Sequence, residues 1–455
     1  MTVPVRRDPL TSFQTVFPRQ FSDAASRVLH VHNQLRSFER MPAQRQDQLL
    51  SGQLNNLLAH AKRHTRFWNK RLSAWTPRPR QPDRILQQIE PLTRKDLQDN
   101  FSQLSAEFKQ REAFGVTEGS SSGSTGTPVR FERSSLIHAP LYFAALMRSY
   151  RWHHIDPKKP LGVVGTRCTD KERAPLGVPF SWLGPVATGF ERCTRNREIS
   201  DIYDYCAERN PAYLQAGPTL LTSLARYAID KRRNELRPKL ALTLGSVVTD
   251  EIRDYVREGL GAKIIDRYSS EETGYIAIQC PKHDHLHVLT PITYMEIVDD
   301  EGNACPVGKP GRVLLTSMQS YAMPLIRYEI GDMAEWAEPC DCGIRLPVVK
   351  KLWGRTRHLI TNPDGNRTYA RIYARDFEKV PGLIEYRIVL HQNAVIVAQV
   401  KFSKRSEAAE SMVVELVQKA LNYPYPVRLR HVDEIDWGKS WKQEYFGVSD
   451  APALL

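Results

Sequence analysis

A run of ten small residues, GSSSGSTGTP from Gly119 to Pro128, has the composition of a phosphate-binding loop. Backbone N–H groups in such a loop can approach a polyphosphate closely, and serine or threonine hydroxyls can donate to its oxygens. The run is not a Walker A loop, because no Gly-Lys-Ser/Thr sequence ends it, and it lacks the G-x-G-x-x-G pattern of a dinucleotide fingerprint. Its composition fits a phosphate loop and a flexible linker equally well.

Two other segments combine cysteine and histidine in a way that could hold a metal ion. Their candidate ligands are Cys280, His283, His285, His287, Cys340 and Cys342. A fold that joins the two segments would supply three thiolates and one imidazole, a tetrahedral set that zinc prefers. Cys280, His287, Cys340 and Cys342 are the predicted zinc ligands, and the other two histidines compete for the imidazole position. The alternative is a group of surface thiols beside a histidine-rich strand edge.

The middle of the chain has the pattern of a sheet with helices, which could position these residues. From about residue 160 to 330, apolar runs such as LGVVG, LALTLGSVV and AKIIDRY alternate with helical patterns, which is typical of a parallel or mixed sheet. Thr249 can cap a helix that ends at Gly261, and AKIIDRY then forms a buried strand. The SSEETG segment after it is expected at the carboxyl end of that strand, where open α/β sheets bind ligands.

The two ends of the chain have different patterns. We expect residues 1–110 to form a helical N-terminal region, in which QLLSGQLNNLLAH places apolar residues at helical spacing. The last part of the chain has the pattern strand, strand, helix, strand. We therefore expect an α/β fold with a large N-terminal domain of mixed sheets packed with helices, whose core is 111–354. A small α+β C-terminal domain at 355–455 follows.

Composition excludes several classes of protein. With 455 residues, 41% hydrophobic and 25% charged, the chain is neither disordered, collagenous nor a coiled coil. No stretch approaches the roughly 18 apolar residues that span a bilayer, and the first residues lack the apolar core of a signal peptide. We therefore expect a cytoplasmic protein without a membrane partner.

Charge and cysteine content add two expectations. Lys and Arg outnumber Asp and Glu by 64 to 51, which suits an anionic partner, although the basic residues are spread in short clusters typical of solvated faces. Seven cysteines is an odd, sparse set that argues against a disulfide framework. The cysteines without a partner pattern are interpreted as buried or incidental thiols: Cys168, Cys193, Cys206 and Cys305.

Three later segments form a set of motifs together with the Gly119–Pro128 loop. They are DRYSSEETGY from Asp266, RYEIGDMAEW from Arg327 and LWGRTRHLI from Leu352. In sequence and spacing the four segments resemble the motifs of the adenylate-forming superfamily, which includes acyl-CoA synthetases, firefly luciferase and peptide-synthetase adenylation domains. The chain looks most similar to the phenylacetate-CoA ligase and coenzyme-F synthetase-like branch. FWNKRL, PLTRKDLQDNF and CDCGIRLP also resemble that branch, and the similarity covers about residues 45 to 445.

The resemblance implies that the 111–354 core binds ATP and an acyl substrate. Tyr268 matches the aromatic residue that flanks adenine, and Glu272 matches the acid that helps to hold Mg²⁺, a cation that prefers carboxylate oxygens. Glu271 stands where relatives more often have threonine, so either acid could face the metal. Gly245 and Ser246 lie where relatives run backbone along the adenine and acyl groups. The implied phosphate loop is Ser121, Ser122, Gly123, Ser124, Thr125, Gly126 and Thr127.

Further residues of the implied site lie near or in the C-terminal domain, which the resemblance implies is mobile. Asp332 matches the aspartate that accepts hydrogen bonds from both ribose hydroxyls, and Arg355 the arginine that joins the ribose or phosphate. Lys439 matches the lysine that neutralises charge as the carboxylate attacks the α-phosphate, with Lys442 as the alternative. The chain departs from the family pattern at three positions. Val129 stands where relatives usually have lysine or a similar residue, and Arg357 and His358 stand where relatives commonly have paired acidic residues.

The resemblance therefore implies a ligase that uses ATP and Mg²⁺ to convert a carboxylic acid, aryl or arylacetic, into an acyl-adenylate with release of pyrophosphate. The acyl group then passes to an acceptor, for which coenzyme A ranks first. An amine, a carrier protein or another small nucleophile is the alternative acceptor. A non-catalytic nucleotide or nucleic-acid binder ranks below both, because the basic charge could equally attract ATP and an anionic acid. The acyl pocket is expected around PAYLQAGPTLL, Gly245 and Tyr268.

Overall fold

The computed structural model describes residues 23–77, 81–109, 111–121, 129–166, 168–173, 189–195, 197–355, 359–370, 372, 374–377, 379–435, 445–449 and 453. The chain divides into two compact units. The first comprises Met1–Val248, Ile252–Ile330 and Ala334–Leu352, and the second comprises Thr249–Glu251, Gly331–Met333 and Trp353–Leu455. No helix among the described residues is both long enough and apolar enough to cross a membrane.

The first unit begins with helices that pack through one apolar face each. They are α1 (Asp23–Phe38), α2 (Ala43–His64), α3 (Arg66–Arg71), α4 (Pro82–Leu86), α5 (Arg94–Asp99) and α6 (Phe101–Leu104). In α2 the residues Leu50, Leu54, Leu57, Leu58 and Ala61 are buried, which is the face expected from the helical spacing. The Thr65 side chain accepts a hydrogen bond from the Trp68 N–H at 3.1 Å and so caps α3.

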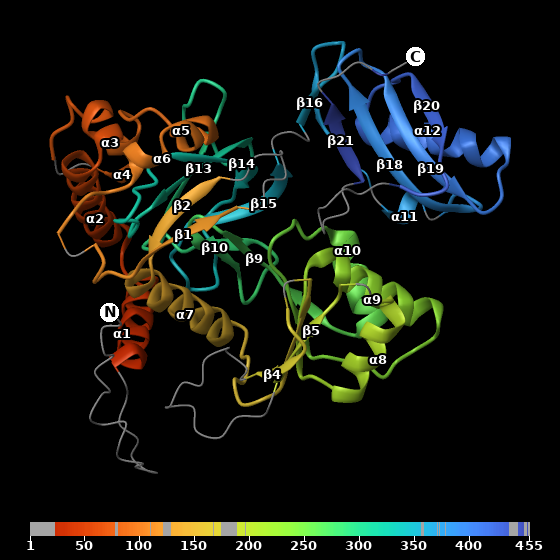
Figure 1. The fold of residues 1–455 in the computed structure, drawn as a ribbon, viewed down its shortest axis with the longest axis horizontal. Helices are drawn as coiled ribbons and strands as arrows, with labels where there is room; N and C mark the ends of the chain where they lie inside the picture. The colour runs from red at the N-terminus through yellow and green to blue at the C-terminus, as the bar shows by residue number, and fades with distance from the viewer. Residues whose placement is uncertain are drawn as a thin grey trace. The chain divides into compact units, whose positions relative to one another are not determined.

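A six-stranded sheet forms one part of the first unit. Its order is β4-β5-β3-β6-β7-β8, from β3 (Leu161–Gly165), β4 (Lys171–Arg173), β5 (Gly189–Cys193), β6 (Tyr213–Gln215), β7 (Leu240–Leu242) and β8 (Lys263–Ile265). All neighbours are parallel except β4, which pairs antiparallel with β5. The helices α8 (Ile199–Arg209), α9 (Pro218–Asp230) and α10 (Asp250–Leu260) share one hydrophobic core beside this sheet (Figure 1).

The chain leaves this sheet at Asp266, so the prediction of a single AKIIDRY strand is wrong. β8 ends at Ile265 in the six-stranded sheet, and β9 (Arg267–Ser270) begins in a different, seven-stranded sheet. The buried Asp266 carboxylate accepts hydrogen bonds from the Thr243 hydroxyl at 3.0 Å and from the Arg267 N–H at 2.8 Å. These bonds fix the crossing point, and they come from residues that an apolar run does not reveal.

The seven-stranded sheet has the order β12-β13-β14-β15-β11-β10-β9. Its strands after β9 are β10 (Gly274–Gln279), β11 (Leu286–Val288), β12 (Thr293–Val298), β13 (Pro310–Ser317), β14 (Tyr328–Trp336) and β15 (Val348–Arg355). β9, β10, β11 and β15 pair antiparallel. The SSEETG segment therefore forms the carboxyl end of β9 and the turn of a β9–β10 hairpin, in the seven-stranded sheet and not in the parallel one.

Two further elements of the first unit lie beside this sheet. β1 (Val116–Ser120) and β2 (Arg130–Ser134) form an antiparallel hairpin, with Ser120 opposite Arg130. The helix α7 (Ser135–Trp152) follows directly and packs against α1 and β10 (Figure 1). The hairpin thus leads directly into the first turn of α7.

The second unit has its own sheet and core. β18 (Leu383–His391) and β19 (Ile396–Phe402) are antiparallel, β20 (Val427–His431) is parallel to β19, and β21 (Phe446–Ser449) is parallel to β18. The remaining elements are β16 (Leu359–Thr361), β17 (Arg367–Tyr369), α11 (Ala374–Phe377) and α12 (Glu407–Leu421). One face of α12 is buried through Ala409, Val413, Val417 and Leu421. The predicted fold class, an α/β large unit with mixed sheets and a small α+β C-terminal unit, is confirmed.

Candidate active site and cysteine–histidine cluster

The described ends of the small-residue loop are held together as a hairpin. The Ser121 N–H donates to the Val129 carbonyl at 2.9 Å, and the Val129 N–H donates to the Ser121 hydroxyl at 3.2 Å. Arg130, the first cation after the loop, is already paired with both oxygens of Glu118 at 2.6 and 2.7 Å. The predicted phosphate-binding residues Ser122, Gly123, Ser124, Thr125, Gly126 and Thr127 lie outside the described residues.

The β9–β10 hairpin carries Tyr268 and Glu272. The Ser270 hydroxyl accepts a hydrogen bond from the Thr273 N–H at 3.0 Å, which closes the turn between the strands. Tyr268 is half-buried in β9, while Glu271 is exposed and Glu272 is half-buried in the turn. Glu272 lines a cleft in the first unit. The hairpin therefore places Glu272 along a concave surface.

A buried polar network supports this hairpin, and sequence reasoning missed it. Arg267 is only 1% exposed. Its guanidinium donates to the Gln215 side chain of β6 at 2.8 Å, to the Thr243 carbonyl at 3.3 Å and to the Tyr275 hydroxyl of β10 at 3.3 Å. Burial raises the pKa of the neighbouring Asp266. The sequence did contain a signal for this buried charge, because Arg267 lies within the otherwise largely apolar run AKIIDRY.

Gly245 and Ser246 lie just beyond the carboxyl end of β7, as their place in the sequence suggests. Both residues are exposed. Gly245 has a φ of +90°, a conformation that side chains with a Cβ rarely adopt. The carboxyl ends of parallel strands are where open α/β sheets bind ligands, so this turn has the position of a ligand-facing backbone segment.

Asp332 and Arg355 form an ion pair in the second unit. Asp332 lies in β14 and Arg355 ends β15, with Nε of Arg355 3.2 Å from Oδ1 of Asp332. The aspartate side chain is 14% exposed and the arginine side chain is 41% exposed. The other residues assigned to this part of the site, Arg357, His358, Lys439 and Lys442, lie outside the described residues.

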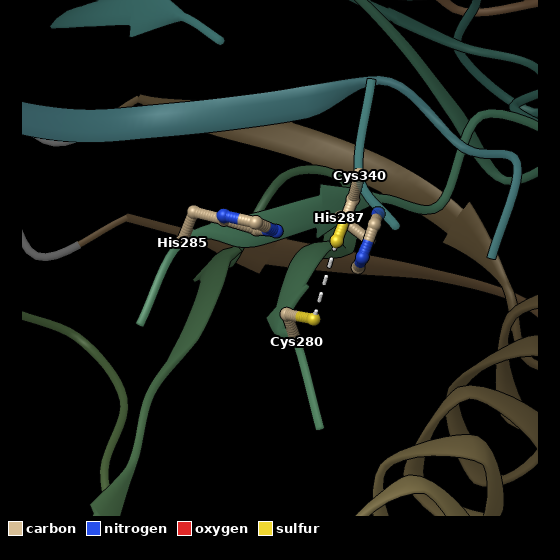
Figure 2. A group of neighbouring side chains, drawn as sticks. All are labelled: Cys280, His285, His287 and Cys340. Carbon is tan, nitrogen blue, oxygen red and sulfur yellow. Dashed lines mark hydrogen bonds between the residues drawn. The ribbon is translucent and has the colours of Figure 1, made fainter. Parts of the chain in front are cut away.

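Cysteine and histidine side chains gather where β10, β11 and the segment before β15 meet. Cys280 Sγ is 3.8 Å from Cys340 Sγ, and Cys342 Sγ is 3.2 Å from His287 Nε2. Figure 2 shows the two sulfurs of Cys280 and Cys340 pointing toward each other, with the His287 ring beside them. The ligand atoms of Cys280, His285, His287 and Cys340 all lie within 4.8 Å of one another.

Backbone groups around the cluster are arranged as around a metal-bound thiolate. N–H groups of Lys282, Cys342 and Ile344 each point at a cysteine sulfur at 3.4 Å, on Cys280, Cys340 and Cys342 respectively. His287 Nδ1 lies 3.4 Å from the Leu346 carbonyl, which leaves Nε2 as the nitrogen that faces the sulfurs. An imidazole held in this way by its second nitrogen is the usual arrangement of a metal ligand.

Sequence comparison finds relatives over part of the chain. No protein-family model matches it. A phenylacetate-coenzyme A ligase of Thermus thermophilus is 30% identical over 184 residues, which is 39% of this chain and 39% of that protein. A phenylacetate-coenzyme A ligase of Pseudomonas putida is 29% identical over 131 residues, or 27% of this chain and 29% of that protein. The matches therefore span well under half the length of these curated relatives.

Solved structures match over more of the chain. 2-Hydroxyisobutyryl-CoA ligase in the postadenylation state, in complex with R3-HIB-AMP, has a TM-score of 0.73 at 17% identity, covering 91% of this chain and 92% of that chain. The anthranilate CoA ligase AuaEII in complex with anthranoyl-AMP has a TM-score of 0.53 at 15% identity, covering 72% and 64%. At these identities the likeness establishes the fold. This chain therefore shares its fold with these CoA ligases and, over part of its length, resembles phenylacetate-coenzyme A ligases in sequence.

Proposed function

We propose that this chain is a ligase that uses ATP and Mg²⁺ to convert a carboxylic acid into an acyl-adenylate, releasing pyrophosphate, and then transfers the acyl group to coenzyme A. A carboxylate repels nucleophiles and has a poor leaving group, whereas AMP is a good one. The phenylacetate-coenzyme A ligases among the sequence relatives support an aryl or arylacetic acid as substrate. The observation that carries the proposal is the β9–β10 hairpin, which holds Tyr268 in its first strand and turns Glu272 toward a cleft.

In this proposal each site residue has a role that its chemistry suits. Tyr268 flanks the adenine, and Glu272 holds the Mg²⁺ that accompanies the phosphates. The backbone at Gly245 and Ser246 runs beside the adenine and the acid. Ser121 and the six residues after it hold the β and γ phosphates, whose charge their hydroxyl and N–H groups would bind.

Asp332, Arg355 and Lys439 are assigned to the ribose and the reacting phosphate. The Asp332 carboxylate presents two acceptor oxygens to the ribose hydroxyls, and Arg355, paired with it at 3.2 Å, joins the ribose or the phosphate. Lys439 neutralises the charge that develops when the acid attacks the α-phosphate, with Lys442 as the alternative. Removal of either lysine should identify which one acts.

The direct test is ATP–pyrophosphate exchange with a panel of carboxylic acids, followed by addition of coenzyme A or an amine to the trapped adenylate. We expect at least one aryl or arylacetic acid to support exchange, and coenzyme A to convert the product to a thioester. Exchange that is followed only by amide formation would replace the proposed acceptor. Failure of every acid to support exchange would refute the proposed reaction.

We also propose that the cysteine–histidine cluster holds a structural Zn²⁺, with Cys280, His287, Cys340 and Cys342 as ligands. Three thiolates and one imidazole fit the tetrahedral preference of zinc, and the three N–H groups directed at the sulfurs stabilise thiolates. His285 is the alternative imidazole, since its ring also lies within 4.8 Å of Cys280 and Cys340. The ion would tie the β10–β11 hairpin to the segment before β15.

A further inference from the structure

The cysteine–histidine cluster contains more ligand side chains than one metal ion can use. A structural zinc ion takes four ligands, and the proposed zinc site assigns them to three cysteines and His287. His283, His285 and Asp341 remain beside that site, on the same two segments of the first unit. These three side chains therefore need a separate explanation.

His283, Cys340 and Asp341 form a second group whose ligand atoms all lie within 4.8 Å of one another. Nε2 of His283 lies 2.7 Å from Oδ1 of Asp341, and Cys340 Sγ lies 3.8 Å from the same oxygen. At bond lengths of about 2.0–2.3 Å, two ligand atoms of a tetrahedral ion lie about 3.3–3.8 Å apart. The sulfur–oxygen distance already fits such an ion. The His283–Asp341 pair would open slightly as the ion replaced the proton between its two atoms.

His285 can supply a fourth ligand to this group. Its Nε2 is buried and has no hydrogen-bond partner within the described part of the chain. A buried ring nitrogen without a partner costs free energy, because water satisfies that nitrogen in the unfolded chain. The His285 ring stacks on His283, with ring centroids 5.1 Å apart and an angle of 26° between the rings. Its ligand atom lies within 4.8 Å of Cys340 Sγ, and Figure 2 shows the side chain extending toward Cys340.

Charge and exposure distinguish the two groups of ligands. Three thiolates exceed the charge of one divalent ion, and Asp341 adds a further negative charge beside Cys340, so a second divalent ion would neutralise both. The side chains of His283 and Asp341 are 43% and 77% exposed, whereas Cys280 and His287 are fully buried. Water can therefore reach an ion in the second group, while an ion in the first site is enclosed.

We propose that the cluster binds a second divalent metal ion through His283, His285, Cys340 and Asp341, and that the Cys340 sulfur bridges this ion to the first. Two imidazoles, a thiolate and a carboxylate suit borderline ions such as Zn²⁺ or Co²⁺, and not Mg²⁺, which prefers oxygen ligands. The inference goes beyond the ligase reaction and rests on the proposed structural zinc. Because its ligands are exposed, the second ion exchanges with free metal and is lost on dialysis, while the first ion stays.

The test adds Co²⁺ to the full chain after dialysis to one tightly held zinc ion. Zinc has no d-electron absorption and binds N, O and S ligands more tightly than cobalt, so cobalt bands report the second ion. We expect about one cobalt ion per chain to bind, with the visible bands of a four-coordinate ion and a thiolate-to-cobalt charge-transfer band from Cys340. Adventitious binding to exposed histidines and carboxylates would give no thiolate band.

Matched variants separate the second ion from the first. His283→Ala removes a ligand at an exposed position and should weaken cobalt binding at least about 10-fold, since even the loss of an outer-shell partner weakens metal binding by that much. Asp341→Asn should act in the same direction. Both variants should retain the tight zinc ion in elemental analysis. His30→Ala, at an exposed histidine of α1 outside the cluster, is the control and should change neither quantity.

The second ion can fail without the first. No cobalt uptake by the chain with one zinc ion, uptake without a thiolate band, or equal cobalt affinity in His283→Ala and the unaltered chain would each overturn the inference and leave the structural zinc in place. A chain that holds no tight zinc ion would overturn both, because the two sites share Cys340. ATP–pyrophosphate exchange tests the ligase reaction independently of all these results.

Discussion

Arg355 at the end of β15 donates from Nε to Oδ1 of Asp332 in the adjacent strand β14, at 3.2 Å. The aspartate is nearly buried and the arginine is substantially exposed, so the pair lies at a surface and not in the core. Such a pair contributes little to stability, about 0–1 kcal/mol. In the proposed site the pair has an orienting role: the arginine holds one carboxylate oxygen and so fixes the direction in which the carboxylate would face the ribose.

Asp332→Asn should therefore impair nucleotide use more than stability. The variant keeps the shape of the side chain but loses its charge and one acceptor. We expect kcat/KM for ATP in the exchange assay to fall by about 10- to 100-fold, while the free energy of unfolding changes by less than about 1 kcal/mol. Asp254→Asn, which removes the charge from another exposed Asp–Arg pair, is the control and should change neither. A large loss of stability in Asp332→Asn would make the pair structural.

Arg267→Met should have the opposite profile, with a large loss of stability. The buried guanidinium bonds Gln215, Thr243 and Tyr275, and its removal leaves these groups without a donor or partner. We expect the free energy of unfolding, measured by urea denaturation, to fall by about 3 kcal/mol, with partial recovery in Arg267→Lys. Arg257→Met, at an arginine side chain that is 69% exposed, should cost under about 0.5 kcal/mol. Equal effects of the two methionine variants would refute a role for the network.

The helix α10 and the strand that follows it show where prediction from the sequence succeeds and where it fails. The helix follows from its amphipathic period, and Gly261 ends it with a φ of +64°. The change of sheet at Asp266 could not be predicted, because an apolar strand has the same pattern whether it stays in one sheet or crosses to another. The crossing depends on Thr243 and Gln279, which are distant in the sequence.

The candidate sites show the same division. Cysteine and histidine are chemically distinctive, and they are few enough in this chain for Cys280, His287, Cys340 and Cys342 to be grouped from their types and spacing alone. Asp341 carries no comparable signal, since a single aspartate in a polar segment is common. Its carboxylate joins the cluster only because the fold brings it to His283, which is distant in the sequence.

Removal of metal should destabilise the first unit if the cysteine–histidine cluster holds zinc. We expect elemental analysis to find about one zinc ion per chain, and a strong chelator to lower the free energy of unfolding by at least about 3 kcal/mol, with recovery on adding zinc. Cys342→Ser should abolish zinc binding, whereas Cys305→Ser, outside the cluster, should retain it. A metal-free protein of unchanged stability would contradict the proposed site.

Acidification should destabilise the protein through His32, which is 4% exposed in α1. Burial and the nearby Arg148 lower the pKa of His32 from 6.5 to about 4, so between these values the unfolded chain binds a proton that the folded chain does not. Stability therefore falls as pH drops from 6.5 to 4, by about 1.4 kcal/mol per pH unit for this group. His32→Phe should reduce the measured slope at about pH 5 by that amount. The exposed-site variant His30→Phe should leave the slope unchanged, and an unchanged slope in His32→Phe would refute the assignment.

The choice between Glu271 and Glu272 as the magnesium ligand can be decided by matched variants. Glu272 lines the cleft and Glu271 is exposed, so Glu272 is the better placed of the two to share a cation with phosphates in the proposed site. We expect Glu272→Gln to lower kcat in ATP–pyrophosphate exchange by at least about 10-fold and to raise the Mg²⁺ concentration needed for half-maximal rate, because a carboxylate ligand is lost. Glu271→Gln should stay within about twofold of the unaltered chain in both quantities, since Glu271 is more exposed than Glu272 and does not line the cleft. A Mg²⁺ titration in which Glu271→Gln is the more impaired variant would reverse the assignment, and the turn after Ser270 would then have to rearrange when the nucleotide binds.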